Sequence, residues 1–203
     1  MMSFGALFDQ DSLLWRSLSF AVDVLWLSVL VVVACIPLIT VGAALVAGVD
    51  MARHLLRGEG HLTGRFVRTF FSQLRQSTIS WLILGFSGVL LLASLYVQAT
   101  PLMVAKIGLG VVWSVLMLWV WPLQAMFSNT ILRTWRNALI FGIGKPGVTL
   151  IMAATDVAWG ALLYISFRYM PQGLPLVMFF GPGLVLVVKV QLLQRALAPY
   201  LVH

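Results

Sequence analysis

Ionisable residues inside apolar segments have the clearest potential for chemistry in this chain of 203 residues. Asp23, Asp156 and Lys189 each lie in a run that is long and apolar enough to cross a bilayer. A charge at such a position is costly, so it normally pairs with another group or serves a polar site. We therefore predict an intramembrane polar site from these three residues. By its expected depth Asp23 meets Lys189 or Arg53, whereas Asp156 has no basic residue at its own level.

Two interpretations of these charges stay open. In the first, ion pairs hold the helices in register and have no further role. In the second, Asp156, together with Tyr164 or Gln191, lines a polar cavity for a solute or a proton. The second interpretation predicts a transporter and the first does not.

Motifs for catalysis or metal binding are missing from the sequence. The segment from Gly142 to Pro146 resembles a phosphate-binding loop, but that motif needs glycine where Leu139 stands and Ser or Thr where Pro146 stands. Cys35 is the single cysteine, which excludes an intrachain disulfide. No metal-ligand spacing joins the three histidines, which are His54, His61 and His203. We expect no enzyme active site, no cofactor and no metal.

Composition indicates an integral membrane protein. Hydrophobic residues make up 61% of the chain and charged residues 9%, whereas a soluble domain has about a quarter charged residues. The mean hydropathy is +1.01. Four uncharged stretches are each about as long as the roughly 20 residues of a spanning helix; they lie between Asp23 and Asp50, Arg75 and Lys106, Lys106 and Arg133, and Arg168 and Lys189. The stretches lack period-two alternation, which disfavours a barrel and predicts an all-α, polytopic helical bundle.

We expect one membrane domain over residues 1–203, with about six transmembrane helices in three hairpins. No cleaved signal peptide is expected, because the N-terminus is acidic rather than basic. The predicted segments are an interfacial N-terminus (1–17), a helical hairpin (18–57), a basic cytoplasmic loop with an interfacial helix (58–76), a second hairpin (77–128), a second basic cytoplasmic loop (129–146), and a third hairpin with the C-terminus (147–203). The segment Leu38–Leu56 either spans fully or is re-entrant, which would leave five spans.

Two local patterns predict how the spans pack. Small residues in the second span allow a neighbouring helix to approach closely; they are Gly42, Ala43, Ala44, Ala47 and Gly48. The sequence Gly181-Pro182-Gly183 predicts a kink in the last span. Thr63 is the expected N-cap of the interfacial helix.

The distribution of Lys and Arg predicts the orientation. An excess of these residues marks the cytoplasmic side of a membrane protein, and counting them places both termini and both basic loops inside. The net charge of +7 is therefore assigned to these loops rather than to nucleic-acid binding. Anionic lipid headgroups attract such a surface by about 1 kcal/mol per residue, and a protein partner could also dock on it. The arginines of this predicted surface are Arg53, Arg57, Arg65, Arg68, Arg75, Arg133 and Arg136.

The first half of the chain resembles the bacterial YesL family, membrane proteins built around a domain of unknown function. The resemblance rests on Thr-Val-Gly-Ala-Ala-Leu from Thr40, the basic helix end from Arg53 to Arg57, Gly58-Glu59, and Phe-x-x-x-Phe-Phe-x-x-x-Arg-Gln-Ser from Phe66 to Ser77. Many members carry proline where this chain has Ala43. The resemblance implies a bacterial inner-membrane protein, often encoded beside ATP-binding-cassette (ABC) carbohydrate transporters.

Three functional hypotheses follow. The first is an auxiliary component of a carbohydrate-uptake system, which contacts ABC transporter subunits or a membrane regulator through the second span, the interfacial helix and the basic loop. The second is a stand-alone small-solute transporter with a polar cavity around Asp156. An intramembrane enzyme is the third, and it would need a paired nucleophile and base that the sequence lacks.

Overall fold

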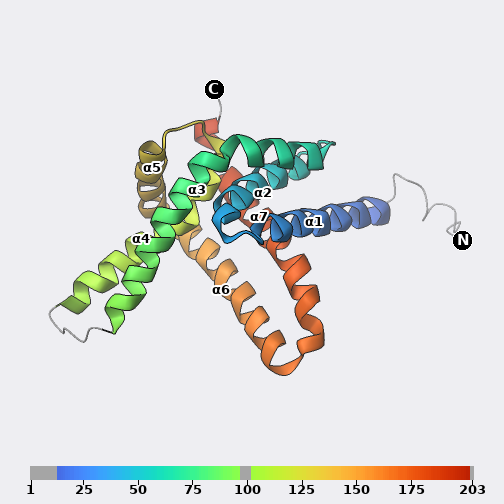
Figure 1. Cartoon of the computed structure of the whole chain (residues 1–203). Coiled ribbons are helices and arrows are strands. Elements are labelled where there is room, and N and C mark those ends of the chain that lie inside the picture. The colour runs from blue at the N-terminus through green and yellow to red at the C-terminus, as the bar shows by residue number, and fades with distance from the viewer. Residues whose placement is uncertain (1–12, 97–101, 202–203) are drawn as a thin grey trace, which may run out of the picture.

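The computed structural model describes residues 13–96 and 102–201, and these form helices joined by short turns. The predicted all-α fold is confirmed. The predicted interfacial N-terminus (1–17) lies mostly outside the described residues. The α-helices, labelled in Figure 1, are α1 (Leu13–Cys35), α2 (Val41–Leu56), α3 (Leu62–Leu95), α4 (Met103–Met126), α5 (Ile131–Gly144), α6 (Pro146–Tyr169) and α7 (Leu174–Leu201). Two 3-10 turns, η2 (Leu38–Thr40) and η4 (Pro171–Gly173), precede α2 and α7.

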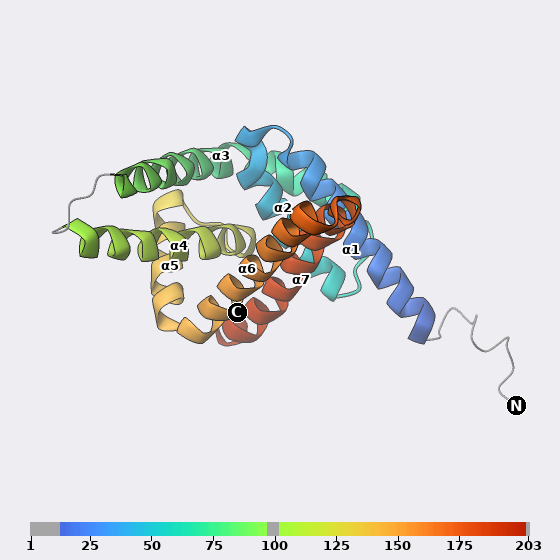
Figure 2. The same cartoon turned by 90° about the horizontal axis from the view of Figure 1, so that it is seen from below.

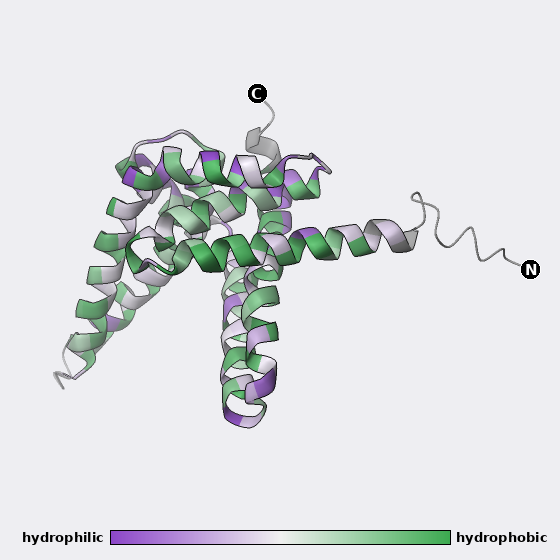
Figure 3. Cartoon of the chain, turned by 45° about the vertical axis from the view of Figure 1, so that its right-hand side comes forward, coloured by the Kyte–Doolittle hydropathy of each residue, from purple (hydrophilic) through white to green (hydrophobic). Residues whose placement is uncertain are grey.

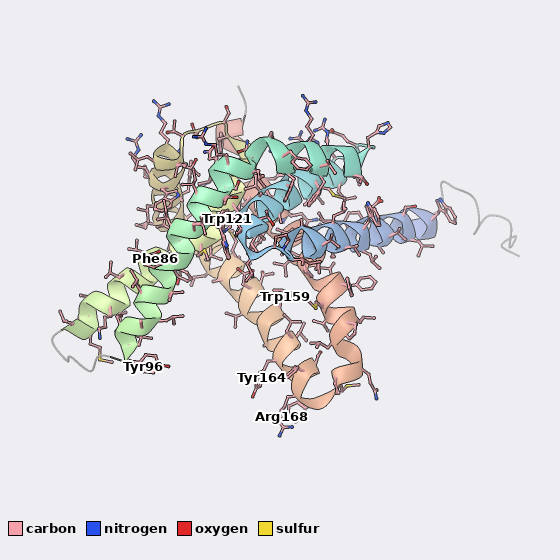
Figure 4. The ribbon with its side chains drawn as sticks, in the orientation of Figure 1. Phe86, Tyr96, Trp121, Trp159, Tyr164 and Arg168 are labelled. Carbon is pink, nitrogen blue, oxygen red and sulfur yellow. The ribbon has the colours of Figure 1, made fainter. Side chains whose placement is uncertain are left out.

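Six of these helices are long and apolar enough to cross a membrane. They are α1, α2 with its preceding turn, α3, α4, α6 and α7, and they correspond to the six predicted spans. Many of their outward side chains are large and hydrophobic, among them Phe86 at 67% and Tyr164 at 68% exposed. Figure 4 shows both of these residues on the outer parts of the molecule. In a bilayer, such surfaces contact lipid.

Helix α2 lies at the centre of the molecule and packs against α1, α3, α4 and α7. Of the most apolar part of its span, 61% is buried, compared with 6% for α6. The small residues that predicted close packing are all buried. The second span is therefore surrounded by the rest of the chain.

Glycines set how closely the neighbouring helices approach α2. A Cβ atom on Gly42 would lie 2.6 Å from the backbone oxygen of Ser77 on α3. A Cβ atom on Gly48 would lie 2.8 Å from side-chain carbons of both Val31 on α1 and Leu186 on α7. Both contacts are shorter than a side chain tolerates, so the packing of α2 requires glycine at these positions.

Two hairpins extend from this centre in different directions. One is formed by α3 and α4 and the other by α6 and α7, as Figures 1 and 2 show. Helix α5, which connects the two hairpins in the chain, packs against α4. Trp119 of α4 is fully buried, and its Nε1 donates a hydrogen bond to Oγ1 of Thr149 on α6 at 3.0 Å. The hairpins thus share the central packing but present most of their outer length to the surroundings.

The structure differs from the sequence prediction in two connecting segments. The predicted interfacial helix and third span form one helix, α3, because no glycine or proline interrupts the chain between Arg65 and Ile83. Its N-cap is His61, which adopts a left-handed φ of 58°, and not Thr63. Most of the predicted second basic loop (129–146) is helical, as α5.

The Gly181-Pro182-Gly183 sequence is bridged to α1 by a serine. Pro182 has no N–H, yet α7 continues through it as a single helix. The backbone N–H of Gly183 donates to Ser28 Oγ at 2.8 Å, and Ser28 Oγ lies 3.2 Å from the carbonyl oxygen of Phe180. One side chain of α1 thereby accepts the backbone N–H that follows the proline. Its single hydroxyl proton faces two carbonyl oxygens, that of Val24 at 3.0 Å and that of Phe180.

Because α2 and α3 approach so closely, one methyl group added at Gly42 should destabilise the fold. We expect Gly42→Ala to reduce the free energy of unfolding by about 1–3 kcal/mol, the usual cost of overpacking. Thermal unfolding in detergent, followed by tryptophan fluorescence, measures this loss. Gly85→Ala on α3 is the matched control, because no atom lies within 4 Å of its added Cβ. Equal stability of the two variants would contradict the packing argument.

Candidate functional site

An ion pair joins α6 and α7. Lys189 Nζ lies 2.6 Å from Asp156 Oδ1 and 2.7 Å from Asp156 Oδ2. The lysine side chain is 13% exposed and the aspartate side chain 40% exposed. The prediction that Asp156 faces no basic residue at its own level is wrong. In the antiparallel hairpin, Asp156 and Lys189 are almost equally far from the turn at Pro171–Gly173, so they lie opposite each other.

The ion pair stands between two cavities. Their volumes are about 380 and 250 Å³, and both are lined by Asp156, Lys189, Leu45 and Leu186. The larger cavity extends to the end of α1 and the smaller one to α3 and α4. Figure 4 labels a tryptophan from each lining, Trp159 for the larger cavity and Trp121 for the smaller.

Apolar side chains form most of both linings. In such surroundings an unpaired charge is strongly unfavourable, and the ion pair offsets the desolvation of both groups. The arrangement can do one of two things chemically. It can hold α6 and α7 in register, or it can offer a polar group to a small solute in a largely apolar cavity.

Asp23 does not join this pair, although the sequence placed all three charges in one polar site. It lines a separate pocket of about 840 Å³ between α1 and the turn that joins α2 and α3. Tyr164 is 68% exposed and lines neither of the two cavities. Gln191 is also exposed, and it too is absent from both linings. The structure therefore brings together Asp156 and Lys189 alone.

Sequence reasoning missed a polar network at the end of α2. His54 Nδ1 lies 2.9 Å from Glu59 Oε2, and Arg65 NH2 lies 3.5 Å from the same carboxylate oxygen. Thr69 Oγ1 donates to Asp50 Oδ2 at 2.8 Å. The available signal was the spacing of Asp50 and His54, which puts both on one helical face beside the polar start of α3. The network links α2, the turn and α3.

The region that contains this network matches a protein family. Residues 20–95 match a family described as "Protein of unknown function, DUF624". The match confirms the resemblance to the YesL family. No curated protein and no solved structure matches the chain.

The DUF624 region includes most of α1 and all of α2 and α3. It therefore holds the central helix, the close contact at Gly42 and the polar network. The ion pair of Asp156 and Lys189 lies outside the matched residues. The protein is thus membrane-helical, with a region over residues 20–95 that matches the DUF624 family. Its intramembrane ion pair belongs to the part beyond that region.

Exposed basic residues lie along the turn after α2, the first half of α3 and α5. Arg53 is set apart, because it is half-buried and its NH1 donates to the carbonyl oxygen of Ala125 at 3.2 Å. A shallow groove of about 550 Å³ runs beside Arg75, where Gln76 Nε2 donates to Asn129 O at 2.7 Å. Figure 3 shows hydrophilic residues along the top of the molecule and also at the tip of the α6–α7 hairpin. The exposed arginines, which we call the basic face, are Arg57, Arg65, Arg68, Arg75, Arg133 and Arg136.

The ion pair predicts a characteristic pattern of stabilities. We expect Asp156→Asn and Lys189→Met each to reduce the free energy of unfolding by about 1–3 kcal/mol, because each leaves an unpaired charge in apolar surroundings. The double variant should recover most of this loss, since it removes both charges. Chemical unfolding in detergent gives the four values of the cycle, and Arg195→Gln on the exposed side of α7 is the control. Additive losses in the double variant would contradict a coupled pair.

Proposed function

We propose that this protein is an auxiliary, non-enzymatic component of a carbohydrate-uptake system of the ABC type in the bacterial inner membrane. Its basic face would contact a transporter subunit or a membrane regulator. The resemblance to the YesL family supports the association with transport, because members are often encoded beside such transporters. The absence of enzymatic activity rests on the sequence, which lacks a paired nucleophile and base.

The observation that carries the proposal is the basic face. Its six arginines are exposed, and within the described residues Glu59 is the acidic residue that pairs with any of them, at 3.5 Å from Arg65 and 3.8 Å from Arg57. The face therefore keeps a net positive charge. Such a surface attracts anionic lipid headgroups, and it also suits an acidic surface on a partner protein, because complementary charge favours and orients association.

The proposed docking surface is narrower than the sequence suggested. Helix α2 was expected to take part in docking, but it is enclosed by four other helices. Contact is therefore assigned to the first half of α3, to α5 and to the groove beside Arg75.

The orientation is part of the proposal, with both termini and the basic face in the cytoplasm. In a Cys35→Ser background, we expect a cysteine introduced at Gly60 to resist an impermeant maleimide in intact spheroplasts and to react after permeabilisation. A cysteine introduced at Gln172, in the turn between α6 and α7, should react in both conditions. Both sites are exposed, so access depends on the side of the membrane. Labelling at Gly60 in sealed spheroplasts would overturn the orientation.

Co-purification tests the auxiliary role. In mild detergent, from cells that contain the native transport system, we expect a transporter subunit to accompany the protein in a fixed ratio. Arg75→Glu combined with Arg133→Glu should reduce its recovery at least tenfold, because both reverse charges of the basic face. Arg168→Glu is the control, since Figure 4 shows this residue at the far end of the α6–α7 hairpin. Undiminished recovery with the double variant would refute docking through this face.

A stand-alone small-solute transporter is the second candidate. The specific observation in its favour is the ion pair of Asp156 and Lys189 between two cavities. Solute flux into liposomes that contain this protein alone, and its loss in Asp156→Asn, would favour this candidate. Absence of flux together with co-purification of a transporter subunit favours the auxiliary role.

A further inference from the structure

The pocket that contains Asp23 has a lining unlike the rest of this basic protein. It measures about 840 Å³ and lies where α1 passes the turn between α2 and α3, which Figures 1 and 2 show side by side. Two carboxylates line it, those of Asp23 and Glu59, whereas its lining contains neither lysine nor arginine. Arginines outside the lining pair with Glu59, so Asp23 is the carboxylate of this pocket that no arginine neutralises.

Three aromatic rings of α1 line the same pocket. Trp15, Phe20 and Trp26 are 47%, 38% and 44% exposed, so a molecule in the pocket can reach them. Trp26 Nε1 donates to Thr63 Oγ1 at 2.8 Å, which holds this indole against the start of α3. Aromatic rings attract cations through their electron-rich faces, and they do so best when a cation carries apolar substituents that also pack on the ring.

The two carboxylates differ in their availability. Glu59 is engaged by His54 at 2.9 Å and by two arginines. Asp23, in contrast, has no hydrogen bond or ion pair with any residue whose side chain the structure describes. It is half-buried beside the aromatic residues, so it is the group in the pocket that can serve as counter-ion to a bound cation.

Glycines account for the open space. Gly58 and Gly60 in the turn and Gly64 at the start of α3 line the pocket. A Cβ atom on any of them would meet no neighbour within 4 Å. Gly58 and His61 adopt left-handed φ values of 69° and 58°, which fold the turn back toward α3. The turn thus closes one side of the pocket without side chains that fill it.

We propose that this pocket binds a molecule with a substituted ammonium group. Asp23 neutralises its charge, and Trp15, Phe20 and Trp26 pack against its alkyl substituents. A metal ion is disfavoured, because no group of three or more metal-ligating side chains exists within the described residues. The ammonium group has two possible sources, a free organic cation or the ethanolamine headgroup of a phospholipid. The site adjoins the basic face, because Arg57 and Arg65 pair with Glu59 of its lining. It shares no lining residue with the two cavities beside the ion pair of α6 and α7.

A titration with choline tests the site. The probe is choline chloride, added to the full chain in detergent, with tryptophan fluorescence as the readout. We expect saturable binding, a loss of affinity of at least tenfold in Asp23→Asn, and a weaker loss in Trp15→Leu. The control ligand is 3,3-dimethylbutan-1-ol, which has the shape of choline without its charge and should not bind. Trp135→Phe, a tryptophan outside the pocket, is the control variant and should bind choline normally.

Several results would overturn the proposal. They are equal binding by Asp23→Asn, equal binding of the uncharged alcohol, or no saturable signal with choline. Because Asp23→Asn could alter folding, its thermal midpoint is measured first, and Trp15→Leu provides a second test that leaves the carboxylate in place. Nanodiscs then separate the two sources of the ammonium group. Weaker apparent choline affinity in phosphatidylethanolamine than in phosphatidylglycerol supports a lipid headgroup at this site, whereas equal affinity supports a free cation.

Discussion

The close packing of α2 is the constraint on which the rest of the structure depends. Lipid chains are as apolar as the helices, so helix association in a membrane relies on shape and on polar contacts rather than on burial from water. Gly42 and Gly48 supply the shape, because they let α3 approach on one side and α1 and α7 on another. The polar end of α2 is satisfied by the network of Asp50, His54 and Thr69. These residues fall within the region that matches the DUF624 family, residues 20–95.

Two of the intramembrane aspartates, Asp23 and Asp156, have different surroundings, although both stand alone in an apolar run of the sequence. Asp156 is paired with Lys189 between apolar cavities, whereas Asp23 lies among aromatic rings near a polar turn. The surroundings differ because Asp156 faces Lys189 on α7, whereas Asp23 faces the turn between α2 and α3. A charge within an apolar run therefore identifies a position of interest, while its role depends on contacts that form only in the folded chain.

Most of the fold could be predicted from hydropathy and charge, because a spanning helix has a strong length requirement. Lys189 was not predicted as the partner of Asp156, because the depth of each residue in the membrane was estimated from its own helix alone. Counting residues from the turn at Pro171–Gly173 places the two opposite each other. The bridge by Ser28 could not be predicted, since it joins residues about 150 positions apart. Helix α5 was taken for a loop, because its 14 residues are too short to span and its arginines suggested solvent.

Helix α3 is longer than a single crossing of the bilayer requires. Its 34 residues extend about 51 Å at 1.5 Å per residue, which exceeds the roughly 30 Å of a hydrocarbon core. The same uninterrupted helix carries arginines of the basic face at one end and the apolar hairpin with α4 at the other, and Figure 1 shows that it bends between the two. It passes α2 at Ser77, where the Gly42 contact leaves no room for a side chain. One continuous helix thus connects the charged end of the molecule to the outer tip of an apolar hairpin.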